Sequence, residues 1–169
     1  MVTPVTHAAT KPAVDDVWGW LEAVPDPEIP VISVVDLGIV RDVAWKGDQL
    51  IVSVTPTYSG CPATAVIAID IEEAIRRRGV SDVRIETRLS PPWTTDWISK
   101  AGREKLKSYG IAPPVDGARC AAELLSPIIE CPHCGSMATE QVSRFGSTPC
   151  KAHWRCRDCL EPFDYFKSF

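Results

Sequence analysis

The chain has 169 residues, of which 45% are hydrophobic and 24% charged, as in a folded protein with one ordinary domain and a small appendage. The formal net charge is −4, and the excess of acidic residues lies before residue 119. This balance argues against sequence-independent nucleic-acid binding, which requires a strongly basic surface. No stretch approaches the ~18 apolar residues of a membrane span, and the first ten residues lack the order of a secretory signal.

The first part of the chain predicts an α+β domain. Its predicted elements are a helix over 14–24, a hairpin of strands over 39–45 and 50–55, a helix over 62–78, a strand over 83–89 and a helix over 95–109. The helices follow from apolar residues at helical spacing, and prolines and glycines mark their ends. The helix over 62–78 is apolar nearly all round in its first half, so we expect it to pack under the sheet. The fold expected for residues 12–114 is a small mixed three-stranded sheet with packed helices.

The last part of the chain predicts a small β domain over residues 126–169, connected by a linker over 115–119. Short strands are expected over 139–145, 153–155 and 163–166, around two pairs of cysteines. These pairs are Cys131-Pro-His-Cys134 and Cys156-Arg-Asp-Cys159, with 21 residues between them. Paired cysteines at this spacing are typical of a tetrahedral thiolate site, most often structural zinc. We therefore expect a zinc-ribbon-like domain in which Cys131, Cys134, Cys156 and Cys159 hold the metal.

Two details of this predicted metal site stay open at the level of sequence. Gly135 can adopt the positive φ that a zinc knuckle needs, whereas Leu160 stands at the matching place in the second pair. Thiolate ligands do not by themselves separate zinc from an iron–sulfur cluster. Cys150, His133 and His153 are further candidate ligands, although we expect both histidines to be exposed to solvent. We expect Cys120 to pack in the protein interior.

The total of seven cysteines is odd, and four of them stand at metal-binding spacing. A reduced, cytoplasmic compartment fits this pattern better than a disulfide scaffold. Zinc ribbons often bind nucleic acid, and Lys151, Arg155 and Arg157 beside Trp154 form a small basic and aromatic group. Three cations in a neutral tail support that role only weakly, and a structural or protein-docking role is favoured.

A solitary cysteine, Cys61, stands at the predicted start of the helix over 62–78, after the loop from Pro56 to Gly60. The unpaired N–H groups and the dipole of a helix N-terminus favour a thiolate, which binds metals or attacks electrophiles. A lone cysteine is more often a small hydrophobic residue of the core. Three further segments change the balance here, because they place polar side chains at entrances of strands or helices. These segments are Asp26-Pro-Glu28, Asp36-Leu-Gly38 and Thr55-Pro-Thr57.

Each of these polar residues alone is consistent with a turn or capping role. Together with Cys61, they predict a site at one edge of the sheet. Trp93 and Trp97 stand near the start of the last predicted helix, and core burial is the favoured interpretation for both, with exposure for docking as the alternative.

The motifs at 26–30, 35–40 and 55–62 resemble those of the iron–sulfur assembly domain family, which includes SufT-like proteins. The resemblance covers roughly residues 12–112. The continuation over 89–98, together with the cysteine-rich tail, resembles the PaaD (PaaJ) branch of that family. Proteins of this branch are encoded with the multicomponent phenylacetyl-CoA oxygenase, or epoxidase, of aerobic phenylacetate degradation.

The resemblance implies an accessory or maturation factor that assists assembly of an iron–sulfur or di-iron centre in that epoxidase. The oxygenase subunit and the reductase subunit are both candidate clients, and a homodimer is left open. On this basis Cys61 would contact iron or a cluster transiently, Asp36 and Thr57 would shape its loop, and Asp26 and Glu28 would line the same edge. The factor itself would not be catalytic, because the sequence contains neither a di-iron Glu-x-x-His pair nor a glycine-rich nucleotide loop.

Two other functions compete with this interpretation. The tail cysteines could hold an iron–sulfur cluster, in which case the protein would be an integral electron-transfer subunit of the epoxidase. A nucleic-acid-binding ribbon is the third hypothesis, and the acidic balance of the chain disfavours it.

Overall fold

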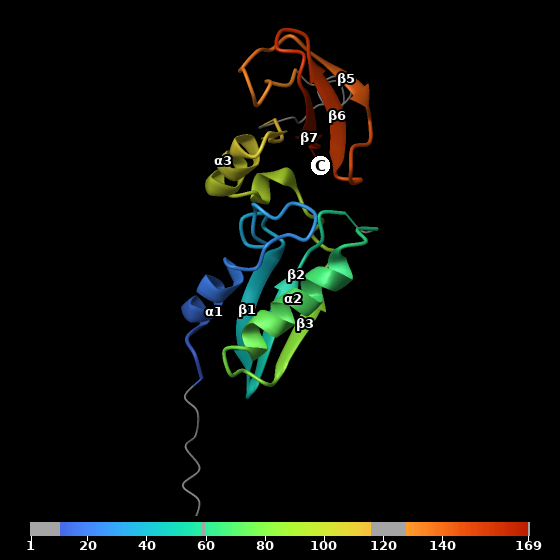
Figure 1. The fold of residues 1–169 in the computed structure, drawn as a ribbon. Helices are drawn as coiled ribbons and strands as arrows, with labels where there is room; N and C mark the ends of the chain where they lie inside the picture. The colour runs from blue at the N-terminus through green and yellow to red at the C-terminus, as the bar shows by residue number, and fades with distance from the viewer. Residues whose placement is uncertain (1–10, 59, 116–127, 169) are drawn as a thin grey trace, which may run out of the picture.

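A computed structural model of the chain describes residues 11–58, 60–115 and 128–168 (Figure 1). The helices are α1 (Val14–Leu21), α2 (Thr64–Arg76) and α3 (Lys100–Ser108), with a short 3-10 helix η1 (Thr95–Trp97). The strands are β1 (Val40–Lys46), β2 (Gln49–Val54), β3 (Val83–Thr87), β4 (Ile111–Ala112), β5 (Thr139–Ser143), β6 (Lys151–Cys156) and β7 (Pro162–Phe166). The α+β class is confirmed, and Cys120 lies outside the described residues.

The first sheet has the order β1-β2-β3 and is mixed, as predicted. β1 and β2 form the antiparallel hairpin, and β3 runs parallel to β2 after the crossover through α2. Figure 1 shows α2 lying across one face of this sheet, with α1 beside it. The polar loops that precede β1 and α2 consequently meet at one end of the sheet.

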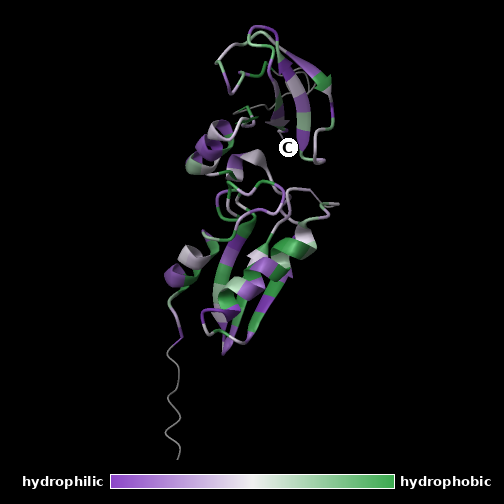
Figure 2. Cartoon of the chain, viewed as in Figure 1, coloured by the Kyte–Doolittle hydropathy of each residue, from purple (hydrophilic) through white to green (hydrophobic). Residues whose placement is uncertain are grey.

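α2 differs from the prediction in two respects. It begins at Thr64 rather than Pro62, so Cys61 precedes the helix and its cap residue Ala63. Although the helix packs against one face of the sheet as predicted (Figure 1), it buries only one stripe, formed by Ile67, Ile71 and Ile75. Figure 2 shows the resulting alternation of hydrophobic and hydrophilic positions along α2. Val66 and Ile69 are exposed on its outer side.

The helix predicted over 95–109 is divided into η1 and α3. Ser99 separates them because its extended backbone makes it the N-cap of α3, where its side chain accepts a hydrogen bond from the backbone N–H of Gly102 at 2.8 Å. Trp93 is buried in the core, as expected, and its ring nitrogen donates to the carbonyl of Leu37 at 2.9 Å. Trp97 is only half-buried, and the guanidinium of Arg41 stacks on its ring at 3.5 Å from the ring centre.

The second sheet has the order β4-β7-β6-β5, so the three strands predicted in the tail are joined by one that the sequence did not reveal. β4 follows α3 closely in the sequence, and its residues Ile111 and Ala112 pair in parallel with β7. The last strand of the first predicted domain therefore completes the sheet of the second.

Further contacts join the two units. The rings of Trp93 and Phe166 lie 6.1 Å apart, and the ammonium of Lys107 lies 3.0 Å from a carboxylate oxygen of Glu130. Phe166 and Cys150 belong to the hydrophobic core of the first unit, although both follow the first cysteine pair of the tail. The two units thus share part of one core.

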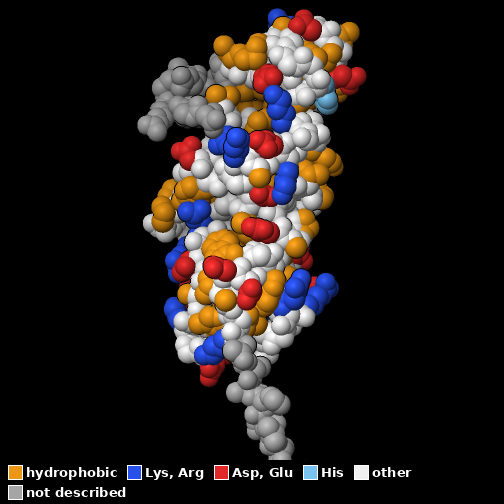
Figure 3. Space-filling view, turned by 90° about the vertical axis from the view of Figure 1, so that its left-hand side faces the viewer, with side chains coloured by type: hydrophobic (Ala, Val, Ile, Leu, Met, Phe, Trp, Pro, Cys, Tyr) orange, Lys and Arg blue, Asp and Glu red, His pale blue; other side chains and the backbone are white. Residues whose placement is uncertain are grey.

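On the face drawn in Figure 3, acidic and basic side chains are interspersed, so neither positive nor negative charge dominates it. Within the described part of the chain, no helix is long and apolar enough to cross a bilayer.

Candidate functional site

The four cysteines of the tail converge on one point, where their side chains could hold a metal ion. Their sulfur atoms all lie within 4.8 Å of one another. The Cys131 and Cys159 sulfurs are 3.8 Å apart, and the Cys134 and Cys156 sulfurs are 3.6 Å apart. A zinc ion bound tetrahedrally at ~2.3 Å from each sulfur places neighbouring sulfurs ~3.8 Å apart. The four side chains therefore fit a single tetrahedral metal ion without rearrangement.

The two knuckles of this site have the same backbone geometry. In each, the N–H of the first cysteine donates to the carbonyl five residues later, from Cys131 to Ser136 at 2.8 Å and from Cys156 to Glu161 at 3.0 Å. In both knuckles, the residue four positions after the first cysteine has a positive φ, which is 76° at Gly135 and 65° at Leu160. Leu160 therefore makes the turn that the sequence suggested only glycine would make.

Backbone donors around the cluster prepare it for a cation. The backbone N–H groups of Cys159 and Asp158, together with the neighbouring thiols of Cys159 and Cys134, lower the pKa of the Cys156 thiol to about 6, against the effect of burial. A lowered pKa favours the thiolate, which is the form that binds a metal.

The other candidate residues of the tail do not join this cluster. His133 is exposed, as expected, whereas His153 is half-buried with its Nδ1 3.5 Å from a carboxylate oxygen of Asp164. Cys150 is buried in the hydrophobic core of the first unit.

The basic group that suggested nucleic-acid binding is not assembled on the surface. Lys151 and Trp154 are buried, and Arg157 pairs with Glu140 at 2.8 Å. The aromatic ring and one of the three cations are therefore withdrawn from any nucleic acid, which removes the observation that motivated that hypothesis.

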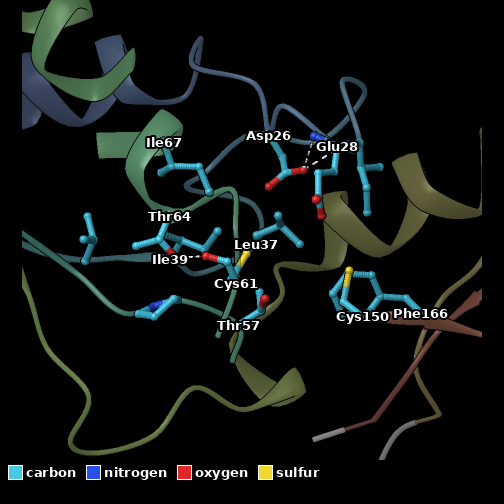
Figure 4. Close-up of a pocket in the computed structure, with 13 residues that line it drawn as sticks. Asp26, Glu28, Leu37, Ile39, Thr57, Cys61, Thr64, Ile67, Cys150 and Phe166 are labelled. Atoms are coloured by element: carbon cyan, nitrogen blue, oxygen red, sulfur yellow. Dashed lines mark hydrogen bonds between the residues drawn. The ribbon is translucent and has the colours of Figure 1, made fainter. Parts of the chain in front are cut away.

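A narrow cavity of about 20 Å³ lies at the end of the first sheet where its polar loops meet (Figure 4). Its lining is apolar apart from Asp26, Glu28, Thr57, Thr64 and two cysteines, Cys61 and Cys150. Four of the five residues predicted to form the site, namely Asp26, Glu28, Thr57 and Cys61, thus line one space. Cys61 is half-buried.

Local hydrogen bonds fix the Cys61 loop. The Cys61 N–H donates to the carbonyl of Tyr58 at 3.2 Å, and its own carbonyl accepts from the hydroxyl of Thr64 at 2.9 Å. These bonds make a tight turn that presents the Cys61 side chain toward the cavity, as Figure 4 shows.

Asp26 organises the acidic loop. One carboxylate oxygen accepts from the backbone N–H groups of Glu28 and Ile29, at 2.9 and 2.8 Å, which is an Asx-type turn (Figure 4). Burial raises the pKa of the Asp26 carboxyl, although these two bonds and the charge of Lys151 act against it. Burial and the nearby Asp26 also raise the pKa of Glu28. The loop therefore holds two carboxyl groups whose negative charge is poorly stabilised.

Asp36, the fifth predicted residue, does not line the cavity. Its carboxylate accepts from the hydroxyls of Ser33 and Ser99, at 3.1 and 2.8 Å, and pairs with Lys105. Burial acts to raise the pKa of Asp36, but these donors outweigh it and hold the pKa below its usual value. Asp36 thereby fastens the loop of Leu37, which does line the cavity, to the start of α3.

Gly38 completes that loop for a steric reason. Its φ is 68°, and a Cβ at this position would lie 2.5 Å from the carbonyl oxygen of Trp97. Only glycine fits, so the Asp36-Leu-Gly38 motif is explained by backbone packing against η1.

Two lining residues, Cys150 and Phe166, were not predicted to be near Cys61. Both come from the C-terminal unit, where Cys150 directly precedes β6 and Phe166 ends β7. The sequence suggests Cys150 only as an alternative ligand for the ribbon metal. The alternation of β7 gives the one available signal, since it predicts that Phe166 and Phe163 point to opposite faces of the strand.

Comparison with known proteins finds two family models that match different parts of the chain. A family model described as "Iron-sulfur cluster assembly protein" matches residues 14–86, and one described as "PaaD zinc beta ribbon domain" matches residues 117–167. The crystal structure of a domain of unknown function, DUF59, from Bacillus anthracis is similar with a TM-score of 0.51 and 28% identity, over 55% of this chain and 90% of that one.

Two relatives of known name extend the comparison. The Fe-S protein maturation auxiliary factor YitW of Bacillus subtilis (strain 168) is 35% identical over 51% of this chain and 85% of its own length. A putative 1,2-phenylacetyl-CoA epoxidase subunit of Escherichia coli (strain K12) is 49% identical over 92% of this chain and 93% of its own length. Because the second match spans both units, the chain belongs to the PaaD family, with an iron–sulfur assembly domain followed by a zinc β-ribbon domain.

Proposed function

We propose that the protein is an accessory factor that assists assembly of a metal centre in a phenylacetyl-CoA epoxidase, and that Cys61 is the residue that contacts the iron or cluster. The observation that carries the proposal is the half-buried Cys61 thiol in one cavity with Asp26 and Glu28. A thiol and two carboxyl groups are groups that iron binds. The names of the relatives support an iron–sulfur assembly role for this domain.

The candidate clients are the oxygenase subunit, with its di-iron centre, and the reductase subunit, with its iron–sulfur cluster. In this role the protein would act in the cytoplasm. A transfer site must bind its cargo reversibly, and a half-open cavity with few strong ligands suits that requirement better than a closed four-thiolate site.

We propose that zinc is the resident metal of the four-cysteine site and that its role is structural. The sulfur separations support one ion, because a multi-iron cluster interposes several metal and sulfide atoms and spreads its cysteine ligands farther apart. All four positions of the tetrahedron are taken by protein ligands, which is typical of structural zinc.

The test compares the wild type with Cys61→Ser during production of the epoxidase and its reductase, with iron content of each purified client as the readout. We expect Cys61→Ser to retain its zinc and its unfolding midpoint but to lower the iron or cluster content of one client severalfold. Val66→Ser, an exposed substitution on α2, is the matched control and is expected to leave the clients fully loaded.

Normal iron content in both clients with Cys61→Ser would refute the assigned role of this thiol. The alternative function, an integral electron-transfer subunit that uses the tail cysteines, makes a different prediction. It requires a coloured protein whose visible absorption is bleached by dithionite, whereas a structural zinc site is colourless. Elemental analysis of anaerobically purified protein distinguishes the two.

A further inference from the structure

β3 is a free edge of the first sheet. In the part of the chain that the structure describes, it pairs with β2 on one side and with no strand on the other. Figure 1 shows α2 across the face of the sheet, while no described element lies beside the outer edge of β3. An uncovered edge presents unpaired N–H and C=O groups to any strand that can pair with them.

The other edges of the two sheets are interrupted. β1 and β5 each contain a register shift in their pairing. β4 consists of only two residues and is followed by Pro113. Bulges, short strands and prolines are features that prevent copies of a protein from pairing edge to edge. β3 has none of them, since its register with β2 is regular from Val83 to Thr87.

Alternate residues of β3 point their backbone groups away from the sheet. The carbonyl of Asp82 and the N–H of Arg88 both bond to β2, at 2.9 and 2.8 Å. The even-numbered residues between them face β2 as well, because a parallel ladder repeats at every second residue, and the odd-numbered residues point the other way. Val83, Ile85 and Thr87 therefore each offer an outward N–H and C=O.

The side chains along this edge follow a self-complementary order of charge. Asp82, Arg84, Glu86 and Arg88 stand at every second position, so they share one face, and their charges alternate in sign. Within the chain their contacts are long: Arg84 and Arg88 lie 3.7 and 4.0 Å from the carboxylate of Glu86. In the reverse direction the series has the opposite sign at each position. An antiparallel second copy therefore meets it with opposite charges.

One register satisfies both the backbone and the charges. Outward-facing residues pair with one another when Ile85 lies opposite Ile85 of the second copy. Arg84 then lies opposite Glu86 of that copy, and Arg88 lies opposite its Asp82. A shift of two residues in either direction places Arg84 opposite Arg84, or Glu86 opposite Glu86, and like charges directly opposite one another are destabilising. Larger shifts leave part of the strand unpaired.

We propose that the protein forms a two-fold symmetric dimer in which the β3 strands of two copies pair antiparallel and join the two three-stranded sheets into one. The charge order of residues 82–88 selects the register. β2 leads into the Cys61 loop and β3 runs parallel to it, so antiparallel pairing places the two cavities at opposite ends of the dimer. The interface therefore covers neither cavity, and the dimer does not depend on the proposed function.

The test measures self-association of the zinc-loaded full chain by sedimentation at increasing protein concentration. We expect a concentration-dependent dimer for the wild type. Arg84→Glu and Glu86→Arg each place like charges opposite one another and should weaken the dimer about tenfold or more. An equimolar mixture of the two variants should restore the dimer, because each variant then meets the opposite charge on the other.

Matched variants and one further measurement locate the interface. Glu104→Arg, at an exposed position of α3, changes the charge as Glu86→Arg does and should dimerise as the wild type does. Thr87→Pro removes an outward N–H that β2 does not use, so it should remain folded and lose the dimer, whereas Thr87→Ala should keep it. Amide hydrogen exchange at Val83, Ile85 and Thr87 should slow as the protein concentration rises.

The proposal is overturned if the wild type stays monomeric up to about 1 mM, or if a dimer forms that Arg84→Glu and Glu86→Arg both leave intact. It is also overturned if the mixture of these two variants stays as monomeric as each variant alone. Slowed exchange at β3 only after addition of an epoxidase subunit would overturn it as well, because the edge would then pair with a strand of that client.

Discussion

The protein contains two sulfur sites that are built in opposite ways. The four-cysteine site draws its ligands from two short turns, and its sulfur atoms already lie at the separations of a tetrahedral ion. The cavity at Cys61 draws its groups from loops of both units and combines fewer thiols with poorly stabilised carboxyl groups. The first arrangement suits permanent binding, and the second suits reversible binding. We infer from this difference that ligand count and burial, rather than the presence of thiols, distinguish the proposed structural site from the proposed transfer site.

The largest effect should follow removal of a ribbon ligand. Cys131 is fully buried in the small core of the C-terminal unit, so Cys131→Ser should release the zinc and unfold that unit. Cys150 should then react rapidly with thiol reagents, because the packing that buries it is lost. Zinc analysis and mass spectrometry after alkylation measure both effects, and Cys61→Ser, which should keep its zinc, is the control. If Cys150 stays unreactive in zinc-free protein, its burial does not depend on the zinc site and the prediction is wrong.

The next largest effect should come from the cavity loop. Gly38→Ala combines a positive φ with a Cβ 2.5 Å from the Trp97 carbonyl oxygen, so we expect a loss of about 3 kcal/mol or more in the free energy of unfolding. Gly47 also has a positive φ, of 58°, but no atom lies within 4 Å of its added Cβ. Gly47→Ala should therefore cost only roughly 1–2 kcal/mol. Urea unfolding tests this, and equal losses at both positions would contradict the packing argument.

Asp26 allows a smaller and pH-dependent test of the poorly stabilised charge. Because burial raises its pKa, the folded protein retains a proton on Asp26 at pH values where the unfolded chain has lost it. The ionised carboxyl therefore lowers stability at neutral pH, and this cost disappears as the pH falls below the usual carboxyl pKa. Asp26→Asn keeps the acceptor for Glu28 and Ile29, so its unfolding midpoint should exceed that of the wild type by a few degrees at pH 7 and match it in acid. A lower midpoint at pH 7 would show that the charge is stabilising.

The smallest effect is expected at the second knuckle. Leu160 is 60% exposed and has a φ of 65°, a conformation that costs a non-glycine residue about 1–2 kcal/mol. Leu160→Gly should raise the free energy of unfolding by only up to about 1 kcal/mol, since glycine also gains freedom in the unfolded chain. Gly135→Ala at the equivalent position should lower it by a similar amount. Thermal unfolding of the zinc-loaded protein measures both, and a destabilised Leu160→Gly would imply that the leucine side chain makes a compensating contact.

Much of the fold was predictable because its signals are local. Periodicity and turn residues predict the hairpin, the crossover helix and the three tail strands, and each lies within a few residues of its predicted place. The boundaries that failed were set by packing. The helix predicted over 95–109 divides at Ser99, whose hydroxyl both caps α3 and donates to Asp36, a residue far away in the sequence.

β4 is a second case in which packing decided. Two residues between Gly110 and Pro113 carry no strand signal of their own, and they become a strand only because β7 is available to pair with them.

The same distinction between local sequence signals and tertiary packing applies to the candidate sites. Spacing predicted the four-cysteine site, because each Cys-x-x-Cys turn brings two sulfurs together, and the pairing of β5 with β6 then brings the two turns to one point. The motifs around Asp26, Thr57 and Cys61 also predicted a shared edge. The place of Cys150 was decided only by tertiary structure, because its contact with the cavity depends on how the ribbon packs through β4 and Phe166 onto the assembly domain. A sequence shows which candidate ligands are neighbours along the chain. Contact between two separate surfaces depends instead on the sum of many packing interactions, which no single motif reveals.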